Sequence, residues 1–327
     1  MTALPRIAVI GAGMAGLACA ARLHAAGLEP VVFDKSRGLG GRLATRRADQ
    51  GRAFDHGAQF ATARSPAFKA FMDDAVANGA AAPWQPRGAE DKPADTPWFV
   101  GTPGMNGMVK PLAAGLDLRL GTPVTGLVRD GAGWRAQSET SDIAPFFDLV
   151  VCTAPAPQAS ALASALPDMG RALDAVAIAP CWALMLAFAV PFKPGFDMKR
   201  LTDGPIALAA RTTSKPGRTA NQECWVVHGG PDWSRTHLEE DFDTIASRLV
   251  AELPTVFGTT APEPVHAVAH RWRFAQTTTP LGEPFLRSAD GTFFAGGDWC
   301  LGARVEAAFE SGTAIAETIL EEQRAQA

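Results

Sequence analysis

Apolar residues in the first half of the chain come in short runs separated by glycine turns. Ile7–Ile10 and Val31–Phe33 have the length and β-branched or aromatic character of strands, and an alanine-rich stretch that ends at Ala26 and Gly27 lies between them. Phe147–Cys152 is a further run of this kind. Short, continuous apolar runs alternating with a helix are typical of parallel strands covered on both faces. The pattern therefore predicts a β–α–β unit at the start of the chain.

The middle of the chain has a different pattern. Trp182–Val190, Ile206–Arg211 and Cys224–His228 are strand-like runs separated by loops, and a helix is expected around Leu238–Leu253. Several strands followed by a helix predict an antiparallel sheet with helices packed on one side. Between the two regions, a helix is expected over Gly104–Ala114.

Three glycines join the first predicted strand to the helix that follows it. Gly11 permits a tight turn, Gly13 lets the backbone approach a pyrophosphate, and Gly16 lets the helix lie close to the strand. Asp34 ends the next strand and can accept hydrogen bonds from both hydroxyls of an adenosine ribose. This is the dinucleotide-binding pattern, with the pyrophosphate at the positive N-terminus of the helix.

Two further segments indicate which dinucleotide is bound. Gly40-Gly41-Arg42 follows soon after Asp34, and Gly296-Gly297-Asp298-Trp299 forms a second glycine-rich turn near the C-terminus. These residues resemble the two-domain FAD oxidoreductases that include the amine oxidases. In that group the first turn lies along the pyrophosphate, and the late Gly-Asp binds the ribityl chain and places a helix N-terminus at the flavin. The resemblance implies noncovalently bound FAD. Because FAD is too long for one β–α–β unit, its flavin half needs a separate binding segment.

Sequence blocks spread along the whole chain narrow this resemblance to the renalases, particularly the bacterial ones. The blocks are Phe54–Phe60, Cys152–Gln158, Ser214–Arg218, His270–Trp272 and Gly297–Cys300. The resemblance implies an α/β fold with a Rossmann-type FAD-binding domain, built as three layers around a mostly parallel sheet. An α+β substrate domain on an antiparallel sheet would be inserted into it, as in p-hydroxybenzoate hydroxylase. His56 departs from the pattern, because the relatives carry an apolar residue there, and its role is open.

Cofactor-binding sequence returns near the C-terminus, so we expect the FAD-binding domain to be discontinuous. It would cover residues 1–77, 104–157 and 285–327, and the substrate domain would cover residues 78–103 and 158–284.

The renalase resemblance implies an oxidase that transfers hydride from the 2- and 6-dihydro isomers of NAD(P)H to flavin N5. It would regenerate NAD(P)+ and reduce O2 to H2O2. The alternative is a flavin amine oxidase or desaturase acting on a small organic substrate, and a third hypothesis is a non-catalytic, flavin-binding redox sensor. Tyrosine is absent, so an aromatic cage for an amine would have to use Trp or Phe.

Several residues are expected to bind the cofactor on the strength of these motifs. Arg42 would neutralise the pyrophosphate, and Gln59 and Phe60 would lie beside the flavin. Arg46 and Arg47 are better explained as solvated surface charges. The full expected set is Gly11, Ala12, Gly13, Met14, Ala15, Gly16, Asp34, Lys35, Gly41, Arg42, Gly57, Ala58, Gln59, Phe60, Val124, Gly297, Asp298 and Val305.

The substrate side has three candidate catalytic residues, His270, Trp299 and Arg211. His270 is expected at the domain junction, and Trp299 follows the flavin-binding carboxylate, where it would stack on the ring edge or line the substrate cavity. Arg211, Lys215 and Arg218 place three cations near one strand end. Such a cluster could hold a phosphate through charge-assisted hydrogen bonds, and a solvated loop explains it equally well.

Composition excludes several classes of function. The 327 residues carry a net charge of −4, which favours neither nucleic acid nor an anionic membrane as a partner. No apolar stretch approaches the roughly 18–20 residues that span a bilayer, and the N-terminus runs straight into a strand, so a cytoplasmic protein is expected. The five isolated cysteines favour neither disulfides nor a zinc site. In the amine oxidases that bind FAD covalently through a cysteine, the cysteine precedes this turn. Cys300 follows the late Gly-Asp, so the resemblance argues against a covalent bond to FAD.

Overall fold

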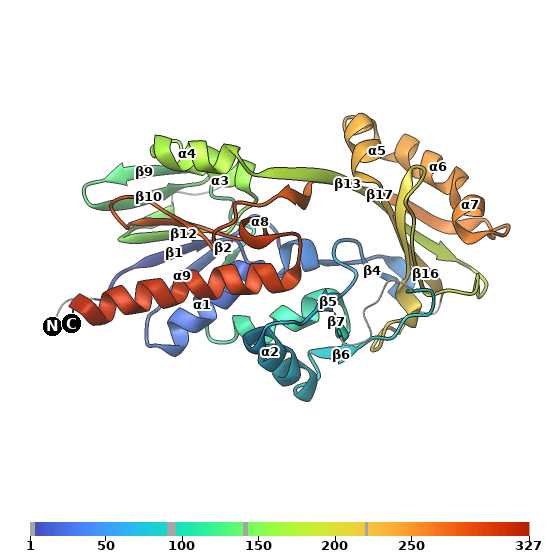
Figure 1. Cartoon of the computed structure of the whole chain (residues 1–327), viewed down its shortest axis with the longest axis horizontal. Coiled ribbons are helices and arrows are strands. Elements are labelled where there is room, and N and C mark those ends of the chain that lie inside the picture. The colour runs from blue at the N-terminus through green and yellow to red at the C-terminus, as the bar shows by residue number, and fades with distance from the viewer. Residues whose placement is uncertain (1–3, 90–95, 140–142, 220–221, 327) are drawn as a thin grey trace. The chain divides into compact units, whose positions relative to one another are not determined.

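The computed structural model describes residues 4–89, 96–139, 143–219 and 222–326, and these residues form two compact units (Figure 1). Unit 1 takes the described residues of Met1–Gly41, Val109–Ile178 and Thr277–Ala327. Unit 2 takes the described residues of Arg42–Met108 and Ala179–Gln276. Each unit is therefore assembled from separate stretches of the chain.

These limits differ from the predicted domain limits. Residues 42–77 and 104–108, expected in the FAD-binding domain, pack in unit 2, whereas residues 158–178 and 277–284, expected in the substrate domain, pack in unit 1. Buried contacts explain both differences. An early strand of the chain brings the carboxylate of Asp55 into the interior of unit 2, and two helices after residue 155 bury their apolar side chains in the core of unit 1.

Unit 1 is built on a six-stranded sheet. Its strand order is β18 (Leu286–Arg287), β19 (Phe293–Ala295), β12 (Leu149–Cys152), β1 (Ile7–Ile10), β2 (Val31–Asp34) and β8 (Asp117–Leu120). All neighbouring pairs are parallel except β18 with β19. The short apolar runs of the sequence form the central strands, which confirms the predicted parallel sheet.

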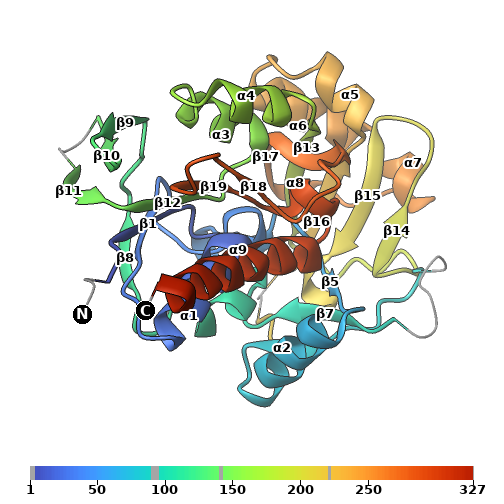
Figure 2. The ribbon, with the colours of Figure 1, turned by 60° about the vertical axis from the view of Figure 1, so that its left-hand side comes forward.

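Two helices, α1 (Met14–Ala25) and α9 (Val305–Gln326), lie side by side on one face of this sheet (Figures 1 and 2). They pack closely because Gly312 of α9 has no side chain: a Cβ atom there would lie 2.0 Å from the carbonyl oxygen of Ala15. On the other face lie α3 (Ala156–Leu162), α4 (Pro167–Asp174) and a three-stranded meander. The meander strands are β9 (Gly126–Asp130), β10 (Gly133–Gln137) and β11 (Ile143–Phe147). Unit 1 thus has three layers, as the resemblance implied.

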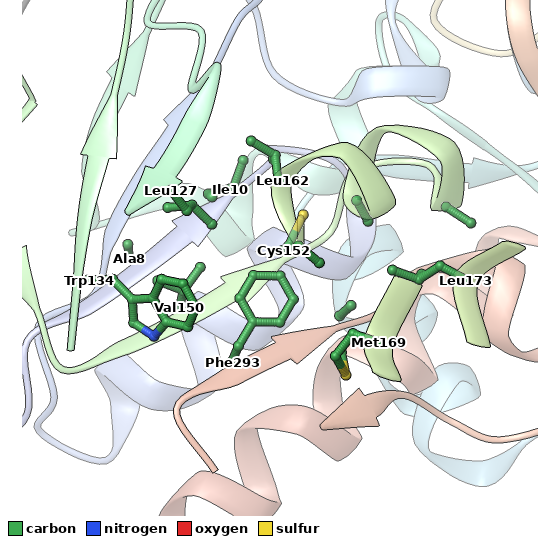
Figure 3. Packing of buried hydrophobic residues seen from close by; sticks show 14 of the residues in the cluster. Ala8, Ile10, Leu127, Trp134, Val150, Cys152, Leu162, Met169, Leu173 and Phe293 are labelled. Atoms are coloured by element: carbon green, nitrogen blue, oxygen red, sulfur yellow. The ribbon is translucent and has the colours of Figure 1, made fainter. Parts of the chain in front are cut away.

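The core on the α3 and α4 face is shown in Figure 3. Val150 and Phe293 point from the sheet toward Leu162 and Leu173 of the two helices, and all four side chains are buried. Trp134 of the meander closes the other end of this cluster, where its ring lies 5.7 Å from that of Phe293. Burial of such large apolar side chains contributes roughly 1.5–3 kcal/mol each.

Unit 2 is built on a five-stranded sheet. Its strand order is β14 (Met198–Arg200), β15 (Ile206–Arg211), β16 (Glu223–Gly229), β13 (Ala177–Phe188) and β17 (Pro264–Thr279). The pairs β14–β15, β15–β16 and β13–β16 are antiparallel. Helices α5 (Pro231–Thr236), α6 (Phe242–Ala251) and α7 (Leu253–Phe257) lie on one face of the sheet (Figure 1). The predicted antiparallel sheet with helices on one side is confirmed.

The remaining part of unit 2 consists of two small sheets and helix α2 (Pro66–Ala77). A two-stranded ribbon pairs β3 (Thr45–Arg47) with β4 (Ala53–Asp55). A three-stranded sheet has the order β5 (Ala61–Thr62), β7 (Trp98–Gly101) and β6 (Ala81–Pro83). The ribbon leads directly into the segment 55–60, which carries several of the predicted site residues.

The helix predicted over Gly104–Ala114 is wrong. The structure has two 3-10 turns there, Met105–Val109 and Pro111–Ala113, separated at the unit boundary. Pro111 lacks the N–H that a continuing α-helix would need, and a Cβ atom on Gly107 would lie 2.0 Å from the carbonyl oxygen of Thr102.

None of the helices in the described part of the chain has the length and apolar character required to cross a bilayer.

Candidate cofactor and substrate sites

The first glycine turn of unit 1 has the geometry that its sequence predicts. Gly11 has a φ of +113°, and its N–H donates to the carbonyl oxygen of Phe33 at 2.7 Å. A Cβ atom on Gly16 would lie 1.9 Å from the carbonyl oxygen of Gly11. No side chain fits at that distance. Gly11 and Gly16 are therefore both required for the tight turn between strand β1 and helix α1.

Asp34 anchors this turn from the end of β2. Its Oδ2 accepts the N–H of Ala12 at 2.7 Å, and its Oδ1 accepts the N–H of Ser36 at 2.7 Å. A carboxylate oxygen can accept two hydrogen bonds, so each oxygen keeps acceptor capacity for a ribose hydroxyl. Lys35, predicted with Asp34, is exposed beside it.

The N-terminus of α1 is open to an anion. Gly13 precedes the helix, no side chain caps it, and a Cβ atom on Gly13 would have no neighbour nearer than 3.9 Å. The second glycine segment lies against this turn, because the N–H of Gly40 donates to the carbonyl oxygen of Ala12 at 2.9 Å and Gly41 has a φ of +54°. Uncapped helix N–H groups beside glycine backbone are suited to a pyrophosphate, so these residues fit the adenosine-diphosphate half of FAD.

The other cofactor candidates of unit 1 lie at the starts of helices or against its core. Asp298 opens the short helix α8 (Asp298–Leu301), and Val305 opens the long helix α9. The N–H of Gly297 donates to the hydroxyl of Ser311 at 2.9 Å, which ties this turn to α9. Val124 is half-buried against the unit 1 core. Met14 and Ala15 are buried in the first turn of α1.

Trp299 does not lie where it was predicted. Its side chain is completely buried in the core of unit 1, and its indole N–H donates to the carbonyl oxygen of Ala154 at 3.1 Å. The prediction that it lines the substrate cavity is therefore wrong. Consecutive side chains of a helix point about 100° apart, so Trp299 faces the core although Asp298 precedes it directly in α8.

In unit 2, Arg42 is held by the segment that contains the other flavin-side candidates. Its backbone oxygen accepts the N–H of Ala58 at 2.9 Å, and a Cβ atom on Gly57 would lie 2.0 Å from the same oxygen. Its guanidinium donates to the carbonyl oxygen of Ala275 at 3.3 Å. Phe60 stacks on Trp98 with ring centroids 3.8 Å apart. The structure thus brings Arg42, Gly57 and Ala58 together.

The three cations predicted to hold a phosphate have other partners. Arg211 makes a bidentate pair with Glu223, with both N–O distances 2.7 Å, and also contacts Asp197. Lys215 and Arg218 are buried, and both pair with Asp55. The phosphate-binding hypothesis and its alternative, a solvated loop, are therefore both wrong. Carboxylates of unit 2 neutralise these three cations.

Asp55 is the centre of this buried ion cluster, which we define as Asp55, Lys215 and Arg218. Its Oδ2 accepts from Lys215 at 3.1 Å and from Arg218 at 2.6 Å. Its Oδ1 accepts from the hydroxyl of Thr45 at 2.7 Å and from the N–H of Met105 at 2.9 Å. Burial acts to raise the pKa of Asp55, but the two cations outweigh it and hold the pKa below its ordinary value. Burial lowers the pKa of Lys215 to about 8, against the opposing effect of Asp55.

Gln59 connects the ion cluster to a group of histidines. Its side-chain oxygen accepts from Lys215 at 2.9 Å, and its amide nitrogen donates to the backbone oxygen of Gly57 at 3.0 Å and to that of Asp55. The same nitrogen lies 3.5 Å from His228 Nε2. Gln59 therefore fixes the segment 55–59 from inside rather than projecting to the surface.

The histidine cluster consists of His56, His228 and His270, with Trp272 beside it. The ring of His56 lies 4.6 Å from that of His270 and 5.0 Å from that of Trp272, centroid to centroid. The backbone oxygen of His56 accepts from the Trp272 indole at 2.9 Å and lies 3.3 Å from His228 Nε2. His56 Nδ1 is buried without a hydrogen-bond partner in the described structure.

Burial keeps these three imidazoles neutral. It lowers the pKa of each of them to about 4. Positive neighbours act in the same direction: Arg46 on His56 and His270, and Lys215 on His228. At neutral pH the cluster is thus an uncharged, largely aromatic group. From the sequence, His270 was a candidate catalytic residue and the block His270–Trp272 supported it, but Trp272 was not itself a candidate, although it lies two residues along the same strand and therefore on the same face.

Two protein-family models match the chain. A family model described as flavin-containing amine oxidoreductase matches residues 84–320, and a model described as an NAD(P)-binding Rossmann-like domain matches residues 9–75.

Solved structures show the same fold. Cyclohexylamine oxidase from Brevibacterium oxydans IH-35A superposes with a TM-score of 0.75 at 14% identity, over 98% of this chain and 100% of that one. Putrescine oxidase, in a structure with bound putrescine, superposes with a TM-score of 0.71 at 15% identity over the same shares.

A curated relative matches over a shorter stretch. A 4,4'-diapophytoene desaturase of Staphylococcus aureus is 48% identical over 52 residues, which are 16% of this chain and 10% of the desaturase. The alignment thus spans about a tenth of the desaturase's length.

Proposed function

Because the chain belongs to the flavin-containing amine oxidoreductase family, we propose that it is an FAD-dependent oxidase that withdraws two electrons from a small organic amine. The observation that carries this proposal is the uncharged histidine cluster of unit 2 with Trp272 beside it. The fold shared with cyclohexylamine oxidase and putrescine oxidase supports the amine class. Bound FAD would supply the two-electron acceptor, and O2 would reoxidise it.

In this proposal the chain holds FAD noncovalently with residues of both glycine segments. The turn at Gly11 and Gly13 and the N-terminus of α1 would bind the pyrophosphate, and Asp34 would bind the adenosine ribose. Asp298 would bind the ribityl chain. Cys300 is an unsuitable tether because its side chain is buried and burial raises the pKa of its thiol to about 12, so it stays protonated.

The histidine cluster would favour the reactive form of an amine. An amine gives up a hydride from the neighbouring carbon only when its nitrogen lone pair is free, so the ammonium form must first lose its proton. Burial and the charge of Arg46 hold His56 and His270 in the neutral form. The same environment opposes an ammonium ion, so the substrate would bind as the free base against Trp272.

A second candidate is oxidation of the 2- and 6-dihydro isomers of NAD(P)H, as in the renalases. Two observations favour it. The blocks Phe54–Phe60, Ser214–Arg218 and His270–Trp272 resemble renalase sequence. A dihydronicotinamide is also an uncharged flat ring, which suits a neutral aromatic cluster that lies close to Arg46 and Lys215.

One experiment separates the two candidates. The purified holoenzyme is mixed anaerobically with cyclohexylamine, putrescine or a borohydride-reduced NAD mixture, and bleaching of the flavin absorbance is followed. Fast bleaching by an amine supports the main proposal, and fast bleaching by the NAD isomers alone supports the second. His270→Ala should slow the bleaching, whereas His24→Ala, on an exposed side of α1, should not. If neither class of substrate bleaches the flavin, both candidates are rejected.

A further inference from the structure

A second set of cations in unit 2 forms no ion pair with any residue that the structure describes. Arg46 and Arg47 belong to strand β3 and are exposed, and within the described ranges neither forms an ion pair. The sequence suggested that they are solvated surface charges. Their exposure agrees with that prediction, and in addition they line a hollow of about 210 Å³ together with His266 and Phe54.

The hollow combines positive charge with an aromatic wall. The ring of His266 stacks on that of Phe54 at 5.3 Å between centroids, with the two planes 8° apart. Asp49 is the acidic residue of the lining, which also contains two arginines. Burial lowers the pKa of His266, and the nearby Arg52 and Arg46 lower it further. The charge balance of the lining is therefore positive.

The hollow and the histidine cluster share one face of strand β17. His266, His270 and Trp272 alternate along this strand, so their side chains lie on the same face. The contacts agree, because His266 stacks on Phe54 while His270 and Trp272 pack on His56. Four residues of strand separate His266 from His270, which corresponds to about 13 Å.

We propose that the hollow lined by Arg46, Arg47 and His266 binds a phosphate group of the substrate. Guanidinium groups bind phosphate through charge-assisted hydrogen bonds, and His266 with Phe54 offers a flat surface beside them. A substrate that reaches both places would carry its phosphate on the His266 side of the histidine cluster. Assigning this phosphate to the substrate rests on the proposed oxidase function and makes the substrate a phosphorylated amine or a dihydronicotinamide nucleotide, whereas the binding site itself rests on neither.

Binding can be measured without turnover. Isothermal titration of the FAD-loaded wild-type protein with inorganic pyrophosphate should show one saturable site per chain. The variant Arg46→Gln/Arg47→Gln should bind it at least about tenfold more weakly, as expected from losing one or more charge-assisted contacts. Arg273→Gln is the matched control, because Arg273 is an exposed cation on the opposite face of β17, paired with Glu239.

The outcomes are distinct. Weaker binding in the double variant, with wild-type binding in the control, supports the site. No saturable binding at millimolar pyrophosphate overturns it, and so does equal binding by wild type and double variant. Titration with acetate tests the ligand class, since acetate binding as tight as that of pyrophosphate would show a general anion site and overturn the phosphate assignment. If an amine bleaches the flavin while pyrophosphate fails to bind, this inference falls and the oxidase proposal stands.

Discussion

Replacing Asp55 by Asn tests whether the buried ion cluster stabilises unit 2. The carboxylate has no solvent exposure, and it accepts hydrogen bonds from four groups, two of which are buried cations. The amide of Asn has one oxygen and one N–H donor side. In either orientation of the Asn side chain, its NH2 group would replace one carboxylate oxygen. The two donors that bind this oxygen in the wild type would then have no acceptor.

The size of the effect follows from what remains buried. Lys215 can lose its proton, because its pKa is already near 8 and removing Asp55 takes away the charge that raises it. Arg218 cannot lose its proton, and its side chain is only 3% exposed. Removing one partner of a buried ion pair typically costs about 3–5 kcal/mol. We expect Asp55→Asn to lower the free energy of unfolding by an amount in this range.

Urea denaturation followed by tryptophan fluorescence measures this free energy. Asp232→Asn is the control, since Asp232 pairs with Arg235 at the surface of the same unit, where a pair is worth about 0–1 kcal/mol. Lys215→Met should cost less than Asp55→Asn, because Asp55 keeps Arg218. A loss of less than about 1 kcal/mol in Asp55→Asn, similar to the control, would refute the reasoning that Asp55 neutralises buried charge.

Three further results are expected. As the pH falls from 6.5 toward 4, the unfolding free energy should decrease, because the unfolded chain protonates imidazoles that the histidine cluster keeps neutral; a flat urea-denaturation profile over this window would contradict the burial of the cluster. Gly16→Ala should abolish flavin binding in an absorbance assay because its Cβ would overlap Gly11, whereas Gly38→Ala, which meets no neighbour within 4 Å, should bind normally. Asp298→Ala should weaken FAD retention by roughly ten- to a hundredfold on dialysis, and an unchanged flavin content would remove Asp298 from the site.

Unit 1 could be predicted from the sequence because its site depends on local geometry. The positive φ of Gly11 and the contact between Gly11 and Gly16 are set within one turn of chain. Asp34 closes the same turn by accepting the N–H of Ala12. Each of these residues is required by its immediate neighbours, so the spacing in the sequence carries the information.

The charges of unit 2 could not be predicted, because their partners are far away in the sequence. Lys215 pairs with a carboxylate 160 positions earlier, and Arg218 pairs with the same group. From the sequence, the cations near residue 215 had no visible partners, whereas Arg46 and Arg47 were predicted to be surface charges and are exposed. One signal was available: Asp55 directly follows Phe54 in an apolar strand, and a carboxylate in such a place needs a cation.

The ion cluster gives a physical reason for the position of the histidines. Burying three charged groups is costly and on its own seldom stabilises a fold more than apolar packing would. Here, however, Lys215 also donates to Gln59, and Gln59 donates to the backbone oxygens of Asp55 and Gly57. These contacts hold both sides of His56, so its ring is fixed against His270 even though its Nδ1 has no partner within the described residues. The buried charges thus act on the candidate substrate site through the backbone that carries His56.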